Sequence, residues 1–173
     1  MIEIRTDRLV LKKPEDDDKE AIVEQIGDWE VAKWLSRVPH PYTAEDADDW
    51  FKIIRRQQLS LSIYLGSSLI GGIGLTEDED GSYEFGYWLG RNYWGHGYAT
   101  EAGAGLLRYA VENLDSPSIN SSYMQGNSAS ANVLSKLGFE ETGKGEIYCV
   151  SRQESVPSMT LILKSSGRRQ DFD

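Results

Sequence analysis

The chain has 173 residues, of which 39% are hydrophobic and 27% are charged. This length and composition predict a single globular domain and exclude a disordered or fibrous chain. The 18 basic and 28 acidic side chains give a net charge of −10, which argues against nonspecific nucleic-acid binding and favours cationic partners and substrates.

The first elements are predicted by hydrophobic spacing. Alternation over residues 8–12 predicts a strand. Capping residues and apolar residues at helical spacing predict helices over residues 16–26 and 28–35. Thr43, followed three residues later by Asp46, resembles a capping box and predicts a third helix.

The hydrophobic period then changes from helical to alternating. Three strands separated by glycine-containing turns are predicted as an antiparallel meander at 61–65, 69–75 and 83–89. The remaining predicted elements are a helix at about 98–113, a strand at 119–124, a helix at about 128–137, and strands near 147–150 and 159–163. This order predicts a mixed α/β (α+β) sheet flanked by helices. We expect residues 1–164 to form the domain and residues 165–173 a polar C-terminal tail.

Residue counts exclude several kinds of site. The single cysteine, Cys149, excludes an internal disulfide, and the cysteine and two histidines are too few for a Cys/His zinc site. We therefore expect no metal. No apolar run approaches the roughly 20 residues of a membrane span, and residues 1–8 lack the apolar core of a signal peptide. We expect a cytoplasmic protein that binds neither membranes nor nucleic acid.

A glycine-rich segment joins the strand at 83–89 to the next helix. Gly95 and Gly97 allow the backbone to approach a ligand closely, and the N–H groups of the following helical turn have no intrahelical acceptor. This combination favours binding of a diphosphate at the positive end of the helix dipole. A dinucleotide fingerprint would need a third glycine where Thr100 stands, and a P-loop would need a Gly-Lys-Ser/Thr sequence. A tight strand-to-helix turn remains the alternative interpretation.

A second polar group begins the helix at about 128–137. Asn127 and Ser130 stand at its first turn, where their side chains either cap the helix or hydrogen-bond an amide-containing ligand. Taken alone, this segment favours plain capping.

Together the two segments resemble the GNAT superfamily of acyl-CoA-dependent N-acetyltransferases, and within it the RimJ/RimL-like branch. The sequence Tyr-Trp-Gly-His-Gly-Tyr-Ala-Thr-Glu-Ala at 93–102 is similar to the signature of this branch, and Asn127 to Phe139 is similar to its second motif. Further similar segments lie at 6–12, 41–47, 70–75 and 84–88. The resemblance covers roughly residues 2 to 164, and it implies a mixed, mainly antiparallel central sheet of about six to seven strands.

The resemblance also implies where acetyl-CoA, the co-substrate, binds. Its diphosphate is expected on Gly95, His96, Gly97, Tyr98, Ala99 and Thr100. Its pantetheine arm is expected along the main chain of Trp88, Leu89 and Gly90. Asn127 and Ser130 match positions that contact the arm near the thioester. The implied reaction is direct attack of a primary amine on the thioester in a ternary complex.

The catalytic residues implied by the resemblance are Glu84 and Ser130. Glu84 is the candidate base, acting through a water, and Ser130 is the candidate that assists the leaving thiolate. Many family members carry a tyrosine acid where Leu134 stands here, so an acid at that position is excluded. Tyr123 and Tyr93 are the alternative proton donors. Asn92 also departs from the Gln or Arg that is common three residues before the first glycine.

Several classes of amine could be the acceptor of the acetyl group. An α-amino group has a pKa near 8 and lysine one near 10.4, so about a tenth of α-amines are neutral at pH 7. The resemblance also favours a protein or peptide N-terminus, while the same branch acts on small cationic amines such as polyamines and aminoglycosides. The alternative is a degenerate member that binds acyl-CoA as a sensor or interaction module without turnover. A homodimer is compatible with the sequence.

Overall fold

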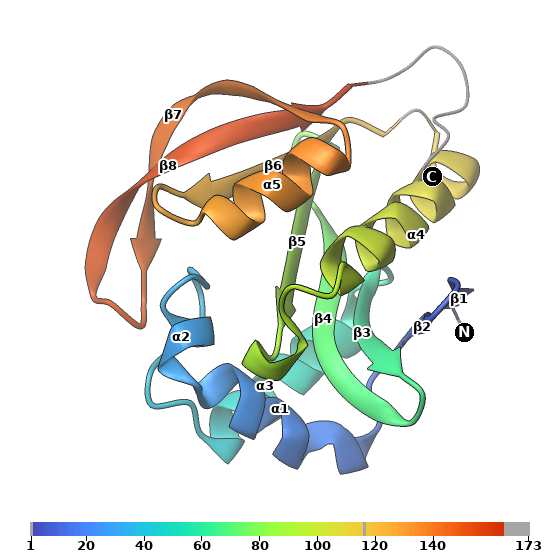
Figure 1. Ribbon diagram of the computed structural model, residues 1–173, viewed down its shortest axis with the longest axis vertical. Helices are drawn as coiled ribbons and strands as arrows, with labels where there is room; N and C mark the ends of the chain where they lie inside the picture. The colour runs from blue at the N-terminus through green and yellow to red at the C-terminus, as the bar shows by residue number, and fades with distance from the viewer. Residues whose placement is uncertain (1, 116, 165–173) are drawn as a thin grey trace.

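The structure, a computed structural model, describes residues 2–115 and 117–164. Its centre is an eight-stranded sheet in the order β1-β2-β3-β4-β5-β6-β8-β7, with helices on both faces (Figure 1). The strands are β1 (Glu3–Arg5), β2 (Leu9–Lys12), β3 (Ser60–Leu65), β4 (Ser68–Glu77), β5 (Tyr83–Leu89), β6 (Ile119–Met124), β7 (Phe139–Cys149) and β8 (Glu154–Leu163). The helices are α1 (Lys19–Gly27), α2 (Trp29–Ala32), α3 (Ala44–Arg56), α4 (Tyr98–Asn113) and α5 (Ser128–Lys136). The expected mixed α/β class is confirmed.

The sheet consists of two antiparallel parts that meet at one parallel pair. In the first part, each of the strands β1 to β5 is antiparallel to the next one in this series. In the second part, β8 is antiparallel to both β6 and β7. Between them β5 and β6 run parallel, and their register is limited to Tyr83 opposite Ile119 and Glu84 opposite Asn120. Beyond these residues the two strands separate (Figure 1). This opening in the middle of the sheet positions the candidate site.

Each face of the sheet has its own hydrophobic core. On one face, α4 contributes Leu106 and α5 contributes Leu134 to a cluster that includes Phe85 of β5. On the other face, α1 contributes Ile22 and α3 contributes Phe51 to a second cluster. The sheet is therefore sandwiched between two helical layers, as expected for helices with one apolar face.

The alternation of side chains along β5 assigns its residues to these two faces. Phe85 and Tyr87 pack in the cluster under α4 and α5, and Trp88 packs against the cluster under α1 and α3. Glu84 shares the Trp88 face, because side chains two and four residues apart point the same way. At Gly72 of the neighbouring strand, a Cβ atom would lie 2.5 Å from the Trp88 indole nitrogen. The missing side chain at Gly72 thus makes room for the Trp88 ring.

The capping box predicted before α3 is confirmed. The Asp46 N–H donates to Thr43 Oγ1 at 3.3 Å, and the Thr43 N–H donates to the Asp46 carboxylate at 2.8 Å. These reciprocal bonds satisfy two donors that would otherwise be unpaired at the start of the helix.

The structure differs from the expectations in the number of strands and in the length of several elements. The sheet has eight strands instead of six to seven, because the three-residue strand β1 was not predicted. Strands β7 and β8 are each longer than expected, since continuous antiparallel pairing carries them through glycines and a proline. Helix α2 stops at Ala32, short of residue 35. The expected tail at 165–173 lies outside the described residues. Within residues 2–115 and 117–164, no helix is long and apolar enough to cross a membrane.

Candidate active site

The glycine loop between β5 and α4 presents a row of backbone donors. Gly95 and Gly97 adopt left-handed conformations, with φ of 76° and 79°. Among the residues that the structure describes, none accepts a hydrogen bond from the N–H groups of residues 95–100. A Cβ atom at Gly95 would meet nothing within 4 Å, so the space in front of the loop is open. Consecutive N–H groups in such a turn, next to a helix N-terminus, suit a diphosphate.

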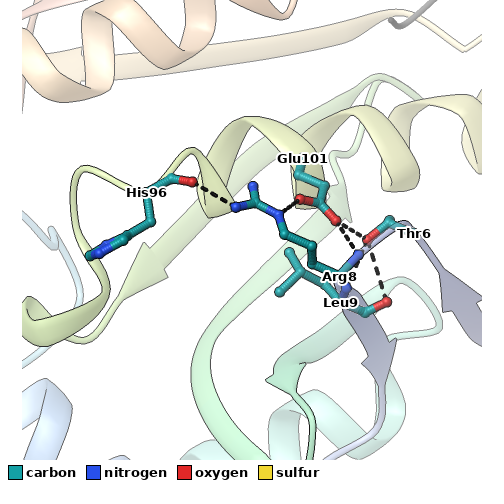
Figure 2. Close-up of polar contacts among 5 residues, drawn as sticks. All are labelled: Thr6, Arg8, Leu9, His96 and Glu101. Carbon is teal, nitrogen blue, oxygen red and sulfur yellow. Dashed lines mark hydrogen bonds and ion pairs between the residues drawn. The ribbon is translucent and has the colours of Figure 1, made fainter.

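An ion pair between Arg8 and Glu101 connects this loop to the turn between β1 and β2 (Figure 2). Glu101, in the first turn of α4, accepts hydrogen bonds from Thr6 Oγ1 (2.6 Å), the Arg8 N–H (2.8 Å) and Arg8 Nε (2.6 Å). Arg8 Nη1 in turn donates to the carbonyl oxygen of His96 at 3.1 Å. Burial raises the pKa of Glu101, but these hydrogen bonds outweigh it and keep the pKa below its ordinary value. Glu101 is therefore a structural residue whose charge is stabilised by the turn between β1 and β2.

The divergence of β5 from β6 leaves part of the β5 backbone without a strand partner. The Gly90 N–H donates to Ile70 of β4 at 2.9 Å, so the alternate residues Tyr87 and Leu89 direct their backbone groups to the opposite side. There the Leu89 carbonyl accepts from the Trp94 indole at 2.9 Å. Within residues 2–115 and 117–164, the Leu89 N–H and both backbone groups of Tyr87 lie beyond the registered pairs of β5 and β6, so they are available to a ligand between the strands.

The predicted pantetheine residues therefore differ in what they can offer. Both backbone groups of Gly90 are engaged, since its carbonyl also accepts from the Tyr93 N–H at 2.9 Å. By the same alternation Trp88 directs its backbone toward β4, so Leu89 is the residue of the three whose N–H faces the opening. Tyr87 was missed by the sequence analysis, because the direction of its backbone groups follows only from the separation of two strands.

One cleft of about 860 Å³ connects the glycine loop, the opening between β5 and β6, and the helices α2 and α3. The predicted site residues that line it are Glu84, Trp88, Leu89, Gly95, Gly97, Tyr98, Ala99, Thr100, Asn127 and Ser130. Gly90 and His96 do not line the cleft. The His96 ring stacks on Tyr98 with 5.6 Å between centroids. The structure thus brings predicted residues from three separate segments to one place.

Glu84 lies in the cleft beside a partner that the sequence analysis missed. Arg37, in the connection between α2 and α3, places Nη2 at 3.2 Å from Glu84 Oε2. The side chains of Arg37 and Glu84 are 78% and 42% exposed. A pair this exposed contributes little to stability, so another cation can replace Arg37 at small cost.

The residues at the start of α5 have two different roles. Asn127 caps the helix, since its Oδ1 accepts from the Ser130 N–H at 3.1 Å. Burial raises the pKa of the Tyr87 hydroxyl, and the Ser130 side chain partly offsets this effect. Leu134, at the position of the common tyrosine acid, is buried in the core with 1% exposure.

The two tyrosines named as alternative acids both line the cleft. The Tyr123 hydroxyl donates to Glu141 Oε1 at 2.7 Å, and this bond to a carboxylate raises the pKa of Tyr123. Tyr93 belongs to a short 3₁₀ helix in the glycine loop.

The comparison with known families rests on most of the chain. The family model described as acetyltransferase (GNAT) domain matches residues 8–140. The chain belongs to the GNAT acetyltransferase family. This GNAT protein is 30% identical, over 147 residues, to a Bacillus licheniformis protein named uncharacterized N-acetyltransferase p20, with 80% of this chain and 82% of the relative covered. It is accordingly an acyl-CoA-dependent acetyltransferase.

Solved structures agree with the fold of this GNAT protein. Mycobacterium smegmatis RimJ, solved in complex with CoA-disulfide, has a TM-score of 0.76 at 18% identity, with 96% of this chain and 88% of that chain covered. A ribosomal-protein-S5-alanine acetyltransferase from Vibrio fischeri has a TM-score of 0.74 at 18% identity, with 95% and 98% covered. These neighbours confirm the expected GNAT fold.

Proposed function

We propose that this protein transfers the acetyl group of acetyl-CoA to the α-amino group of a peptide or protein N-terminus, with small cationic amines as the other acceptor class. The observation that carries the proposal is one cleft joining the unpaired N–H groups of residues 95–100, the free β5 backbone and the Glu84 carboxylate. The Vibrio fischeri neighbour, named for an alanine of a ribosomal protein, supports a protein acceptor.

The glycine loop would hold the diphosphate of acetyl-CoA through backbone N–H groups. The arm would then run between β5 and β6, where Tyr87 and Leu89 offer backbone groups and where Asn127 and Ser130 face it. The Leu89 N–H is our candidate for polarising the thioester carbonyl, because a fixed backbone donor stabilises the negative charge that develops on that oxygen. Acetyl-CoA itself supplies the activated acetyl thioester.

Glu84 would accept the proton of the attacking amine through a water. The incoming ammonium group replaces Arg37 beside the carboxylate, so the acceptor is drawn to the base before it loses its proton. The amine nitrogen forms the amide bond as the carbon–sulfur bond breaks. Its proton goes to Glu84, and the CoA sulfur takes a proton from the Ser130 hydroxyl. Ser130 would then regain a proton from water and Glu84 would release its proton to water, so the net products are the acetylated amine and CoA.

An α-amino acceptor fits this site better than a lysine side chain does. With a pKa near 8, roughly a tenth of an α-amine is already neutral at pH 7, against less than a thousandth of a lysine amine. A site whose proposed base, Glu84, is a half-exposed carboxylate is therefore better suited to the α-amine.

Calorimetric titration with acetyl-CoA tests the cofactor part of the proposal. Gly97→Glu places a side chain at a residue with φ of 79°, which strains the backbone, and adds a negative charge to a loop suited to an anion. We therefore expect the affinity for acetyl-CoA to fall at least 100-fold. Gly81→Glu is the matched control: Gly81 has φ of 82° in the turn before β5, away from the loop. Equal binding by wild type and Gly97→Glu would contradict the loop assignment.

Release of CoA in the presence of peptides tests the acceptor part. We expect turnover with a free N-terminus and none when the same peptide carries a blocked α-amine and a free lysine. Polyamines and aminoglycosides complete the panel. Tight acetyl-CoA binding with no release for any amine would instead indicate the acyl-CoA sensor or interaction module.

A further inference from the structure

The Arg8 guanidinium binds both the Glu101 carboxylate and the His96 carbonyl, which are far from Arg8 in the sequence. It lies in the turn between β1 and β2, 85 or more residues before the loop that it contacts. One of its edges binds Glu101 at 2.6 Å, and Nη1 binds the His96 carbonyl at 3.1 Å (Figure 2). Its third nitrogen, Nη2, lies 3.5 Å from where a Cβ atom of Gly97 would be. The guanidinium thus lies against His96 and Gly97 of the glycine loop.

The bond to His96 fixes the direction of a backbone donor. The carbonyl of His96 and the N–H of Gly97 belong to one planar trans peptide unit, so they point in opposite directions. Holding that carbonyl toward Arg8 therefore aims the Gly97 N–H toward the open side of the loop. Because Gly97, on one side of this peptide unit, permits many backbone conformations, the unit has few other restraints on its orientation.

Two further contacts keep the guanidinium in this orientation. Its carbon atom lies 4.6 Å from the centre of the Tyr98 ring, so the planar group is held over the ring face. Glu101 receives additional hydrogen bonds from Thr6 and from the Arg8 N–H, which hold the carboxylate in place on its other side. A lysine has no planar fork with which to bind both Glu101 and the His96 carbonyl.

We propose that Arg8 is a positioning residue for the diphosphate of acetyl-CoA, acting through the His96 carbonyl on the Gly97 N–H. The proposal rests on the acetyl-CoA site of the proposed function. Glu101 binds the Arg8 guanidinium directly, and Thr6 hydrogen-bonds Glu101.

The test compares Arg8→Met with Arg5→Met by calorimetry. Arg5 is a matched control, since it is an exposed arginine of β1 whose ion pair is with Glu3. We expect Arg8→Met to weaken the binding of CoA at least tenfold. The binding of adenosine 3′-phosphate 5′-diphosphate should weaken by a similar factor. Pantetheine, which has no phosphate, is measured by nuclear magnetic resonance titration and should bind wild type and Arg8→Met alike.

Thr43→Ala separates positioning from stability. It removes the side-chain bonds that cap α3 and does not alter a residue that lines the cleft, so it should lower the unfolding temperature while CoA affinity changes less than twofold. Unchanged CoA affinity in Arg8→Met, or equal losses for CoA and pantetheine, would overturn the positioning role. Absence of CoA binding by folded wild type would instead contradict the proposed function.

Discussion

Glu84 is the residue on which the proposed chemistry most depends. Its carboxylate lies in the cleft, on the face of β5 that points away from the α4 and α5 core, and its partner in the described structure is the exposed Arg37. It is thus accessible to an acceptor and to the water that would carry the proton.

Glu84→Gln should lower kcat about 100-fold and leave the Kd for acetyl-CoA unchanged. The amide keeps the size of the side chain but cannot accept the amine proton, and general-base catalysis contributes roughly that factor or more. Steady-state kinetics and calorimetry make the measurement, and Glu79→Gln in the exposed turn before β5 is the control.

Glu84→Asp should retain more activity than Glu84→Gln, because a shorter carboxylate can still act through a water. Similar kcat values for Glu84→Gln and wild type would exclude Glu84 as the base.

At this scale the sequence predicted the identity of the loop residues better than their individual roles. Gly95 and Gly97 were recognisable because their spacing before a helix has a backbone meaning. The pairing of Glu84 with Arg37 joins residues 47 positions apart, and no local pattern reveals it. Likewise, the engaged backbone of Gly90 depends on its place beside β4.

At the scale of elements, the separation of β5 from β6 is the feature that makes the cleft. Ser121 of β6 lies just beyond the last registered pair, and its hydroxyl donates to the Phe85 carbonyl at 2.9 Å. Ser121 is 6% exposed and Phe85 is 2% exposed. A side-chain bond thus replaces the backbone ladder at the point of divergence.

Ser121→Ala should therefore lower the free energy of unfolding by about 1–2 kcal/mol, because a buried carbonyl loses its donor. Chemical denaturation measures this loss. Ser122→Ala, on the opposite face of the same strand, should change stability by less than about 0.5 kcal/mol. Equal effects of the two substitutions would show that the Ser121 bond has no special role.

Most helices and strands were predictable because hydrophobic period and capping residues are local signals. The strand β1 was missed because three residues, two of them exposed and charged, give no recognisable alternation. The full hairpin of β7 and β8 was missed because Gly143, Gly145 and Pro157 interrupt its pattern. These residues are accommodated by pairing and by a register shift between Glu141 and Gly143, and pairing is a property of two segments together.

At the scale of the whole molecule, the net charge of −10 acts on every ligand that approaches. A cationic acceptor is attracted at long range, and dissolved salt screens this attraction beyond about 10 Å at 0.1 M.

We therefore expect the KM of a peptide with two lysines near its free N-terminus to rise at least threefold between about 20 and 300 mM salt. A peptide of the same length with two glutamates at those positions should show a KM that falls or stays constant. Parallel behaviour of the two peptides would mean that the overall charge has no part in acceptor capture.

The Thr6–Arg8–Glu101 contacts also bear on how short this protein can be made. The GNAT family match covers residues 8–140, yet Thr6 and β1 precede it and β8 follows it. Strand β8 lies between β6 and β7, so a chain cut at residue 140 would leave β6 with an unpaired edge. A chain begun at residue 8 would lose the Thr6 hydroxyl that binds Glu101 behind the loop. We therefore expect the minimal folding unit to be longer at both ends than the segment by which the family is recognised.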